Sequence, residues 1–190
     1  ATFTARRQEI RLRRAGSAEE TLSSDDPLAV LSSMLDDYQA VHLPNLPRFT
    51  GGVVGYAAYD MVRYYEKLGE GPEDDRGLPD LAFGLYRTMV IFDHVSKTIK
   101  VVANAHVTDD PGAAYAEAQE AIERVISRLR EGTNLPVGEV NFVGLPQKPF
   151  RSNMTRERFC EVVERCKEYI RAGDIFQVVP SQRLMVETTA

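Results

Sequence analysis

The sequence predicts a chain that combines α-helices with antiparallel β-hairpins. Two Asp-Pro pairs, Asp26-Pro27 and Asp110-Pro111, each place an N-cap residue before a proline at the first helical position. Each pair precedes a stretch whose apolar residues recur at helical spacing. Residues 87–93 and 98–105 are instead rich in β-branched and apolar side chains, and the turn between them is typical of a β-hairpin.

The composition is that of an ordinary globular protein. Of 190 residues, 43% are hydrophobic and 27% are charged, which supplies enough apolar material for a sizeable core. The formal net charge of −5 argues against nucleic acid as the main partner. No apolar run approaches the ~18 residues of a membrane span, and the start lacks the apolar region of a signal peptide. Cys160 and Cys166 lie ~9 Å apart along one predicted helix, which favours reduced thiols and a cytoplasmic setting.

The first forty residues predict a hairpin followed by a helix. In residues 1–14 apolar side chains partly alternate with arginines, and we expect a turn near Gln8-Glu9. No aromatic residue interleaves with these arginines, so a solvated strand face explains them better than a phosphate-binding patch. Residues 16–25 predict a polar loop. The helix after Asp26 has an apolar face formed by Leu28, Leu31, Leu35 and Tyr38.

The stretch Phe49–Asp60 contains three glycines among apolar residues. It lacks the lysine and Ser/Thr of a phosphate-binding loop, so we interpret the glycines as sites of close backbone packing. The stretch continues into a short helix predicted to run through Lys67. Four tyrosines lie in this region: Tyr56, Tyr59, Tyr64 and Tyr65. They form a polar network, a ligand wall or a packing surface, and the sequence does not choose between these. An acidic, turn-rich loop follows at residues 69–77, before a predicted strand at 78–86.

A domain boundary is expected after the second helix. That helix starts after Asp110 and ends at Gly132, with basic residues in its last turn, as the helix dipole prefers. Residues 132–151 contain repeated glycines and prolines and no periodicity, which is typical of a linker. We therefore predict an N-terminal domain at residues 1–131, a linker at 132–151 and the start of another domain at 152–190.

The C-terminal stretch contains a third helix and a predicted strand. Thr155 is the expected N-cap, and Gly173 is the expected stop. We expect a strand from Ile175 onward. It carries polar residues among apolar ones, and each needs a hydrogen-bond partner or a ligand: Gln177, Ser181, Gln182 and Arg183.

Two long motifs resemble one known family. Residues 49–66 (FTGGVVGYAAYDMVRYYE) are similar to the N-terminal-domain signature of component I of anthranilate synthase, among the chorismate-utilising enzymes. Ser152-Asn-Met-Thr155 and residues 172–183 (AGDIFQVVPSQR) resemble the start of the same family's chorismate-binding domain. The sister family, aminodeoxychorismate synthase component I, usually departs from the second motif after Gln-Val, so the residues here favour anthranilate synthase.

The resemblance implies a fold and an activity. The fold would be α+β, with antiparallel sheets flanked by helices. The activity would be Mg²⁺-dependent amination of chorismate at C2, followed by elimination of pyruvate, which yields anthranilate for tryptophan biosynthesis. Ammonia would come from a glutamine amidotransferase subunit (component II), tryptophan would be a feedback inhibitor, and we expect an oligomer.

Several functional parts of that family would lie outside residues 1–190. These are the tryptophan-binding motifs, the Mg²⁺ ligands and the catalytic acid and base, so we expect the isolated chain to be an inactive fragment of a longer protein. One candidate functional residue does lie within residues 1–190. Gln177 matches the position where isochorismate synthases have a water-activating lysine. A neutral amide cannot act as a base, so Gln177 would position substrate or ammonia. Alternatively, it satisfies a neighbouring backbone group.

Overall fold

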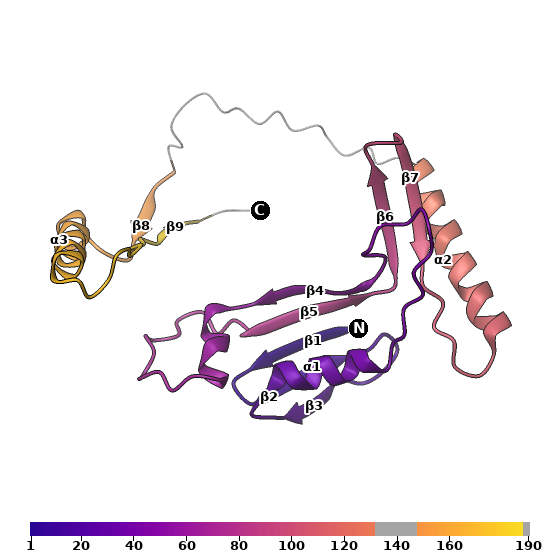
Figure 1. The fold of residues 1–190 in the computed structure, drawn as a ribbon, viewed down its shortest axis with the longest axis horizontal. Coiled ribbons are helices and arrows are strands. Elements are labelled where there is room, and N and C mark those ends of the chain that lie inside the picture. Colours follow the sequence, from indigo (N-terminus) through magenta and orange to yellow (C-terminus); the bar gives the residue numbers. More distant parts are fainter. Residues whose placement is uncertain (132–147, 188–190) are drawn as a thin grey trace. The chain divides into compact units, whose positions relative to one another are not determined.

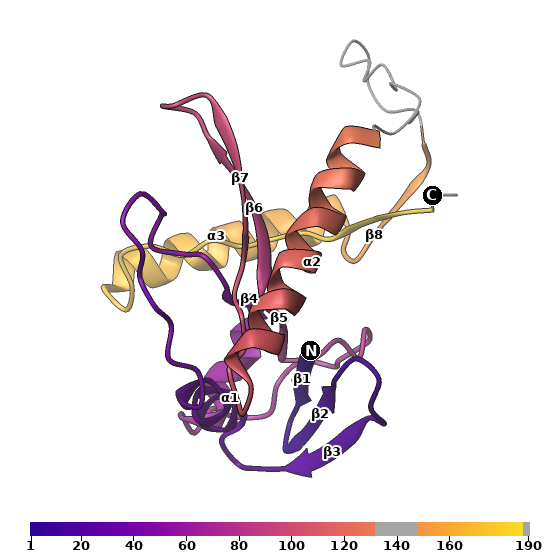
Figure 2. The same cartoon turned by 90° about the vertical axis from the view of Figure 1, so that its right-hand side faces the viewer.

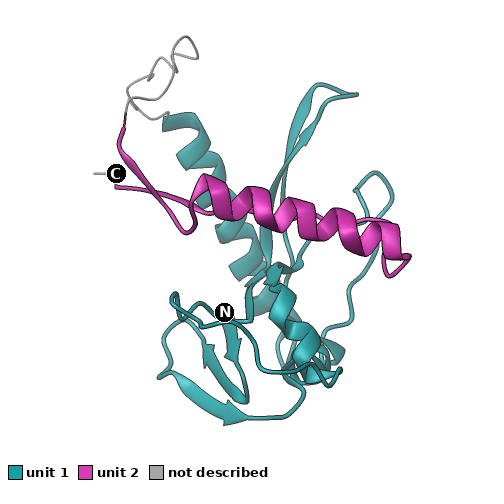
Figure 3. Cartoon of the chain, turned by 90° about the vertical axis from the view of Figure 1, so that its left-hand side faces the viewer, with its two compact units in different colours: residues 1–134 teal, residues 135–190 magenta. Residues whose placement is uncertain are grey.

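The computed structural model describes residues 1–131 and 148–187. The chain divides into two compact units, residues 1–134 and 135–190, which are considered separately below (Figure 3). Most of the predicted linker, residues 132–151, lies outside the described residues, so the predicted domain boundary stays a prediction. In the described part, no helix is both long and apolar enough to cross a membrane.

The first unit is built on a five-stranded antiparallel sheet of order β3-β2-β1-β5-β4 (Figure 1). The predicted N-terminal hairpin is confirmed, with its turn at Arg7 and Gln8. The polar loop predicted at 16–25 is wrong in part, because residues 20–23 form β3 and pair with β2. The strands are β1 (Thr2–Arg6), β2 (Glu9–Arg13), β3 (Glu20–Ser23), β4 (Gly52–Ala57) and β5 (Leu81–Tyr86).

One face of this sheet is covered by the helix α1 (Pro27–Asp36) (Figure 1). Alternate residues of β1 and β2 point into the core, as the period of a half-buried strand requires. The predicted cap of α1 is confirmed: the Asp26 side chain accepts a hydrogen bond from the Ala29 N–H, and Pro27 occupies the first turn. The buried core residues are Phe3, Ala5, Ile10, Leu12, Leu31 and Leu81.

The tyrosine-rich stretch forms a short 3₁₀ helix, η1 (Tyr59–Tyr64), held by polar contacts. The Tyr64 hydroxyl donates to Asp80 Oδ2 at 2.7 Å, and the Tyr65 hydroxyl donates to Asp26 Oδ1 at 2.8 Å. Desolvation and the Asp80 carboxylate together raise the pKa of Tyr64. Of the three interpretations above, the polar network therefore describes these two tyrosines.

A hairpin and a long helix complete the first unit. Strands β6 (Thr88–Asp93) and β7 (Thr98–Ala103) pair as predicted, and the predicted second helix, α2 (Pro111–Glu131), packs against β7 (Figure 2). Two side chains fix the segment before β4 to residues in and next to this hairpin. Lys100 Nζ donates to Asn45 O at 3.1 Å, and Asn104 Nδ2 donates to Thr50 O at 2.8 Å.

In the second unit, residues 148–187 form the helix α3 (Arg156–Ala172) and a two-stranded antiparallel sheet. The strands are β8 (Phe150–Ser152) and β9 (Leu184–Val186), so the strand predicted to start at Ile175 is wrong in its bounds. A strand needs a neighbouring backbone, and β8, the strand paired with this part of the chain, is three residues long. Pro180 also lacks the N–H that a ladder requires.

Candidate functional site

The sequence places its candidate site in residues 174–183, which directly follow α3. The helix stops at Gly173, which has the left-handed φ of 83° that glycine adopts without strain. The Gly173 N–H donates to Ile170 O at 3.2 Å, and the Asp174 N–H donates to Tyr169 O at 3.1 Å. Both bonds satisfy carbonyls of the last helical turn, so the start of the segment is fixed by the helix cap.

The other end of the segment is held by Asn153. The Arg183 N–H donates to Asn153 Oδ1 at 2.9 Å, and the Asn153 N–H donates to Arg183 O at 3.1 Å. One residue thus satisfies both backbone groups of Arg183. The pairing continues the β8–β9 ladder by one position, because Ser152 is opposite Leu184.

Ser152 adds a side-chain contact to the same place. Gln182 Nε2 donates to Ser152 Oγ at 2.7 Å, and the Ser152 hydroxyl donates to Met154 O at 2.5 Å. The Met154 N–H in turn donates to Ser152 Oγ at 3.2 Å. We refer to Ser152, Asn153, Gln182 and Arg183 together as the polar clip.

Gln177 lies between these two anchors with an exposed side chain. Within the described residues it has no hydrogen-bond partner, whereas Gln182 has one in the polar clip. The neighbouring apolar side chains are also open to solvent: Phe176 is 94% exposed and Val179 is 79% exposed. The segment is therefore an open surface in this unit.

The charges on α3 act on the helix itself. The Thr155 side chain accepts from the Arg158 N–H as the predicted N-cap. Lys167 donates to Glu164 at 2.7 Å, and this hydrogen bond lowers the pKa of the Glu164 carboxyl. Such exposed ion pairs contribute little to stability, because solvent screens them. A lowered pKa is the opposite of what a general acid needs, so Glu164 is not a candidate for that role.

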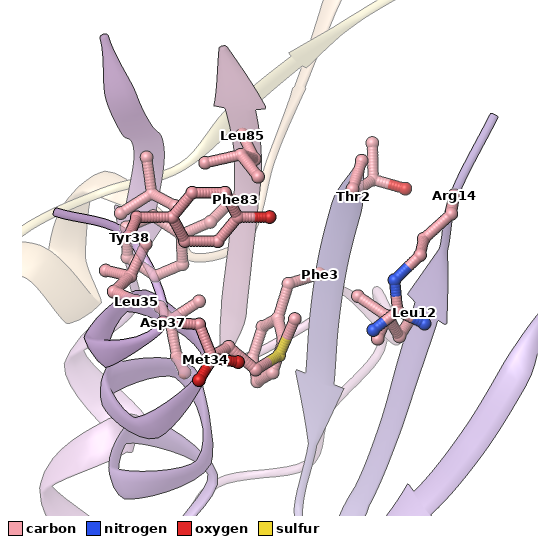
Figure 4. A pocket seen from close by; sticks show the side chains of 13 residues that line it. Thr2, Phe3, Leu12, Arg14, Met34, Leu35, Asp37, Tyr38, Phe83 and Leu85 are labelled. Carbon is pink, nitrogen blue, oxygen red and sulfur yellow. The ribbon is translucent and has the colours of Figure 1, made fainter. Parts of the chain in front are cut away.

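The first unit contains a small cavity between α1 and the sheet (Figure 4). Its volume is about 100 Å³, well below the roughly 300–1,000 Å³ of common ligand pockets. Its walls are mostly apolar, with Phe3, Met34 and Phe83 among them, and Asp37 and Arg14 lie at the rim. We interpret it as a gap in the packing under α1.

The described residues contain no group of three or more His, Cys, Asp or Glu side chains able to hold a metal ion. Mg²⁺ prefers several carboxylate and water oxygens in octahedral geometry. The described residues therefore do not fit the Mg²⁺ that the family resemblance implies.

Sequence reasoning missed the polar clip. In the sequence, Ser152 and Asn153 stand out only as part of the family motif, and Gln182 and Arg183 are expected to be strand residues that need partners. The partners lie 30 residues away, which no local pattern reveals. The one available signal was that Ser and Asn side chains often hydrogen-bond to backbone near a helix start.

Comparisons with known proteins agree with these motifs. The family model described as "chorismate binding enzyme" matches residues 3–190. Anthranilate synthase component 1 of Acetivibrio thermocellus is 37% identical over 179 residues, covering 92% of this chain and 36% of that protein. The chloroplastic anthranilate synthase alpha subunit 2 of Arabidopsis thaliana is 37% identical over 180 residues, covering 87% of this chain and 28% of that protein.

A solved structure is similar over the whole chain. The crystal structure of anthranilate synthase component I from Streptococcus pneumoniae TIGR4 superposes with a TM-score of 0.72 at 27% sequence identity. It covers 100% of this chain and 42% of that structure. The predicted α+β fold with antiparallel sheets is therefore confirmed. The chain spans about a third of the length of the curated relatives, 36% for the Acetivibrio thermocellus protein.

Proposed function

The chain belongs to the chorismate-binding enzyme family, and from that premise we propose that it is part of an anthranilate synthase component I. The full-length protein would convert chorismate and ammonia to anthranilate and pyruvate in tryptophan biosynthesis. Chorismate would gain an amino group at C2, lose its C4 hydroxyl as water and then release pyruvate. The observation that carries this proposal is the pair of motifs at residues 49–66 and 172–183, supported by relatives of that name at about 37% identity.

We assign Gln177 a positioning role next to substrate or ammonia. Its amide donates and accepts hydrogen bonds but does not take up a proton near neutral pH, so it is not a general base. Ammonia is already a nucleophile and needs orientation, which fits a neutral amide at this position. Gln177 is exposed between two anchors, so its hydrogen-bonding groups are available to a ligand.

The remaining parts of the reaction come from the family resemblance. Mg²⁺ would be held by residues outside this chain, and ammonia would be delivered by a component II glutamine amidotransferase. Tryptophan would act as feedback inhibitor, also through residues outside the chain. We further propose that the full-length enzyme is cytoplasmic and oligomeric.

The test uses the full-length protein with chorismate, Mg²⁺ and ammonium, with fluorescent anthranilate as the product. We expect anthranilate from the full-length protein and none from the isolated 190-residue chain. Gln177→Ala should lower kcat/KM by about tenfold or more, because orientation contributes strongly to such reactions. Gln119→Ala, at an exposed position on α2, is the matched control and should leave the rate unchanged.

Two results would change the assignment. Aminodeoxychorismate in place of anthranilate would assign the protein to the sister enzyme, aminodeoxychorismate synthase component I. Turnover by the isolated chain, free of full-length protein, would refute the view that this piece is structural or regulatory rather than catalytic by itself.

A further inference from the structure

We propose that Asn153, with Ser152, is a positioning residue for the reaction: the polar clip fixes the segment that presents Gln177. The inference rests on the proposed function, because it gives Gln177 a place next to the substrate. It concerns residues that neither touch the substrate nor carry the chemistry. Its starting point is that residues 174–183 pair with no other strand in the part of the chain that the structure describes.

The segment is anchored at two points. At its start, Gly173 and Asp174 close the last turn of α3 through two backbone hydrogen bonds. At its end, Asn153 satisfies both the N–H and the C=O of Arg183. Between these points the described residues form no helix or strand and most of their side chains are exposed, so the two anchors set where Gln177 lies.

The β8–β9 ladder alone is a weak determinant of register. It pairs three residues with three, and of its six members only Ser152 and Met185 are even partly buried. A strand register is strongly specified only where one face is buried, and a slip by one residue turns every side chain to the other face. Asn153 removes this ambiguity, because its side chain accepts from one particular amide, that of Arg183.

Ser152 strengthens the same register. Its hydroxyl receives the Gln182 amide and is itself oriented by two bonds to the Met154 backbone. Shifting the segment by one residue would break the Gln182 contact and both Asn153 contacts together. The polar clip therefore fixes the number of residues between the C-terminal cap of α3 and β9. This number determines where Gln177 lies and in which direction its side chain points.

The experiment compares variants of the full-length enzyme. Asn153→Ala removes the acceptor for the Arg183 amide and is expected to lower kcat/KM for chorismate by about 10–100-fold, the usual cost of losing an orienting partner. Asn153→Asp keeps an oxygen acceptor at the same place and should restore most of the rate. A residue that only supports folding would not show this rescue in kcat/KM at equal amounts of folded protein.

Thr155→Ala is the control for loss of stability. It removes the N-cap of α3, next to the polar clip, and leaves the Asn153–Arg183 contacts in place. We expect it to lower Tm as much as Asn153→Ala while kcat/KM stays within about threefold of the wild type. Equal losses of kcat/KM in the two variants, or no recovery in Asn153→Asp, would overturn the proposal. If Asn153→Ala does not fold, Ser152→Ala replaces it under the same criteria.

Hydrogen exchange separates this inference from the proposed function. The Arg183 amide should be protected in the wild type, exposed in Asn153→Ala and protected again in Asn153→Asp. If the wild type makes no anthranilate, the proposed function fails, and this pattern of protection still tests the polar clip. If the wild type is active but the Arg183 amide exchanges freely, the polar clip fails on its own.

Discussion

Gly55 lies in the edge strand β4, at a position where a side chain has no room. A Cβ there would come within 2.6 Å of Phe83 Cα and still closer to Ala82 O, both backbone atoms of β5. Backbone in a paired strand does not move aside as the end of a flexible side chain does. The glycine therefore allows β4 to approach β5, which is the structural role the sequence predicts for this motif.

We predict that Gly55→Ala destabilises the protein by about 1–3 kcal/mol, the common cost of overpacking. Gly69→Ala is the matched control, because a Cβ there meets nothing within 4 Å. That change should be neutral or slightly stabilising. Urea denaturation of both variants measures the difference, and equal midpoints would mean that β4 and β5 adjust to the added methyl group.

At the scale of elements, helix α1 is tied to η1 through one carboxylate. Asp26 accepts from the Ala29 N–H at 2.9 Å and from the Tyr65 hydroxyl at 2.8 Å, and these two bonds lower its pKa. The folded protein therefore binds the proton of Asp26 less readily than the unfolded chain, where the pKa is about 3.9. Its contribution to stability is complete above that value and is lost as the pH falls through the folded pKa.

The variant Asp26→Asn tests this dependence. Asparagine keeps an oxygen that caps α1 but does not ionise. We predict that the wild type is more stable than the variant near neutral pH, and that the difference in Tm shrinks as the pH is lowered towards about 3. A difference in Tm that stays constant with pH would show that ionisation of Asp26 does not contribute.

The elements that sequence predicts well are those defined locally. The start of α1 was predictable from Asp26-Pro27, and both ends of α3 were predictable from Thr155 and Gly173. Each of these residues caps the helical turn next to it, so a local pattern reveals it. Strand β3 escaped prediction because all four of its residues are exposed, so no apolar alternation marks them. The strand expected from Ile175 had the right composition, but composition does not reveal whether a neighbouring backbone is present.

The difference between local patterns and distant partners also explains which parts of the candidate site were predictable. The importance of Gln177 came from the family motif, and its role stays a proposal. The partners of Gln182 and Arg183 were beyond prediction because Ser152 and Asn153 are 30 residues away. The sequence pattern indicated that Gln182 and Arg183 needed hydrogen-bond partners, and the structure identifies those partners.

For the whole chain, the uneven distribution of burial is the main feature. Among the described residues, the buried hydrophobic core lies in the first unit, between Phe3 and Leu81. In the second unit none of the described residues is buried, and Phe150, Phe176 and Val179 are all more than half exposed. Apolar surface of this kind favours association with further protein.

We predict that the isolated 190-residue chain self-associates as its concentration rises. Val179→Lys should weaken this association, because it places a charge on the apolar segment at a 79% exposed position. Val95→Lys is the control, since Val95 is 96% exposed at the turn of the β6–β7 hairpin. Light scattering over a concentration series measures the effect, and a chain that stays monomeric throughout would contradict the prediction.

The pairing of β1 with β5 sets an order of events during synthesis. Phe3 lies opposite Phe83, 80 residues later, so β1 is made well before β5, its second neighbour in the sheet. At about 5–20 residues per second the wait is roughly 4–16 s. During that time β2 can pair with one edge of β1, and the edge that will pair with Leu81–Tyr86 stays open to other nascent strands.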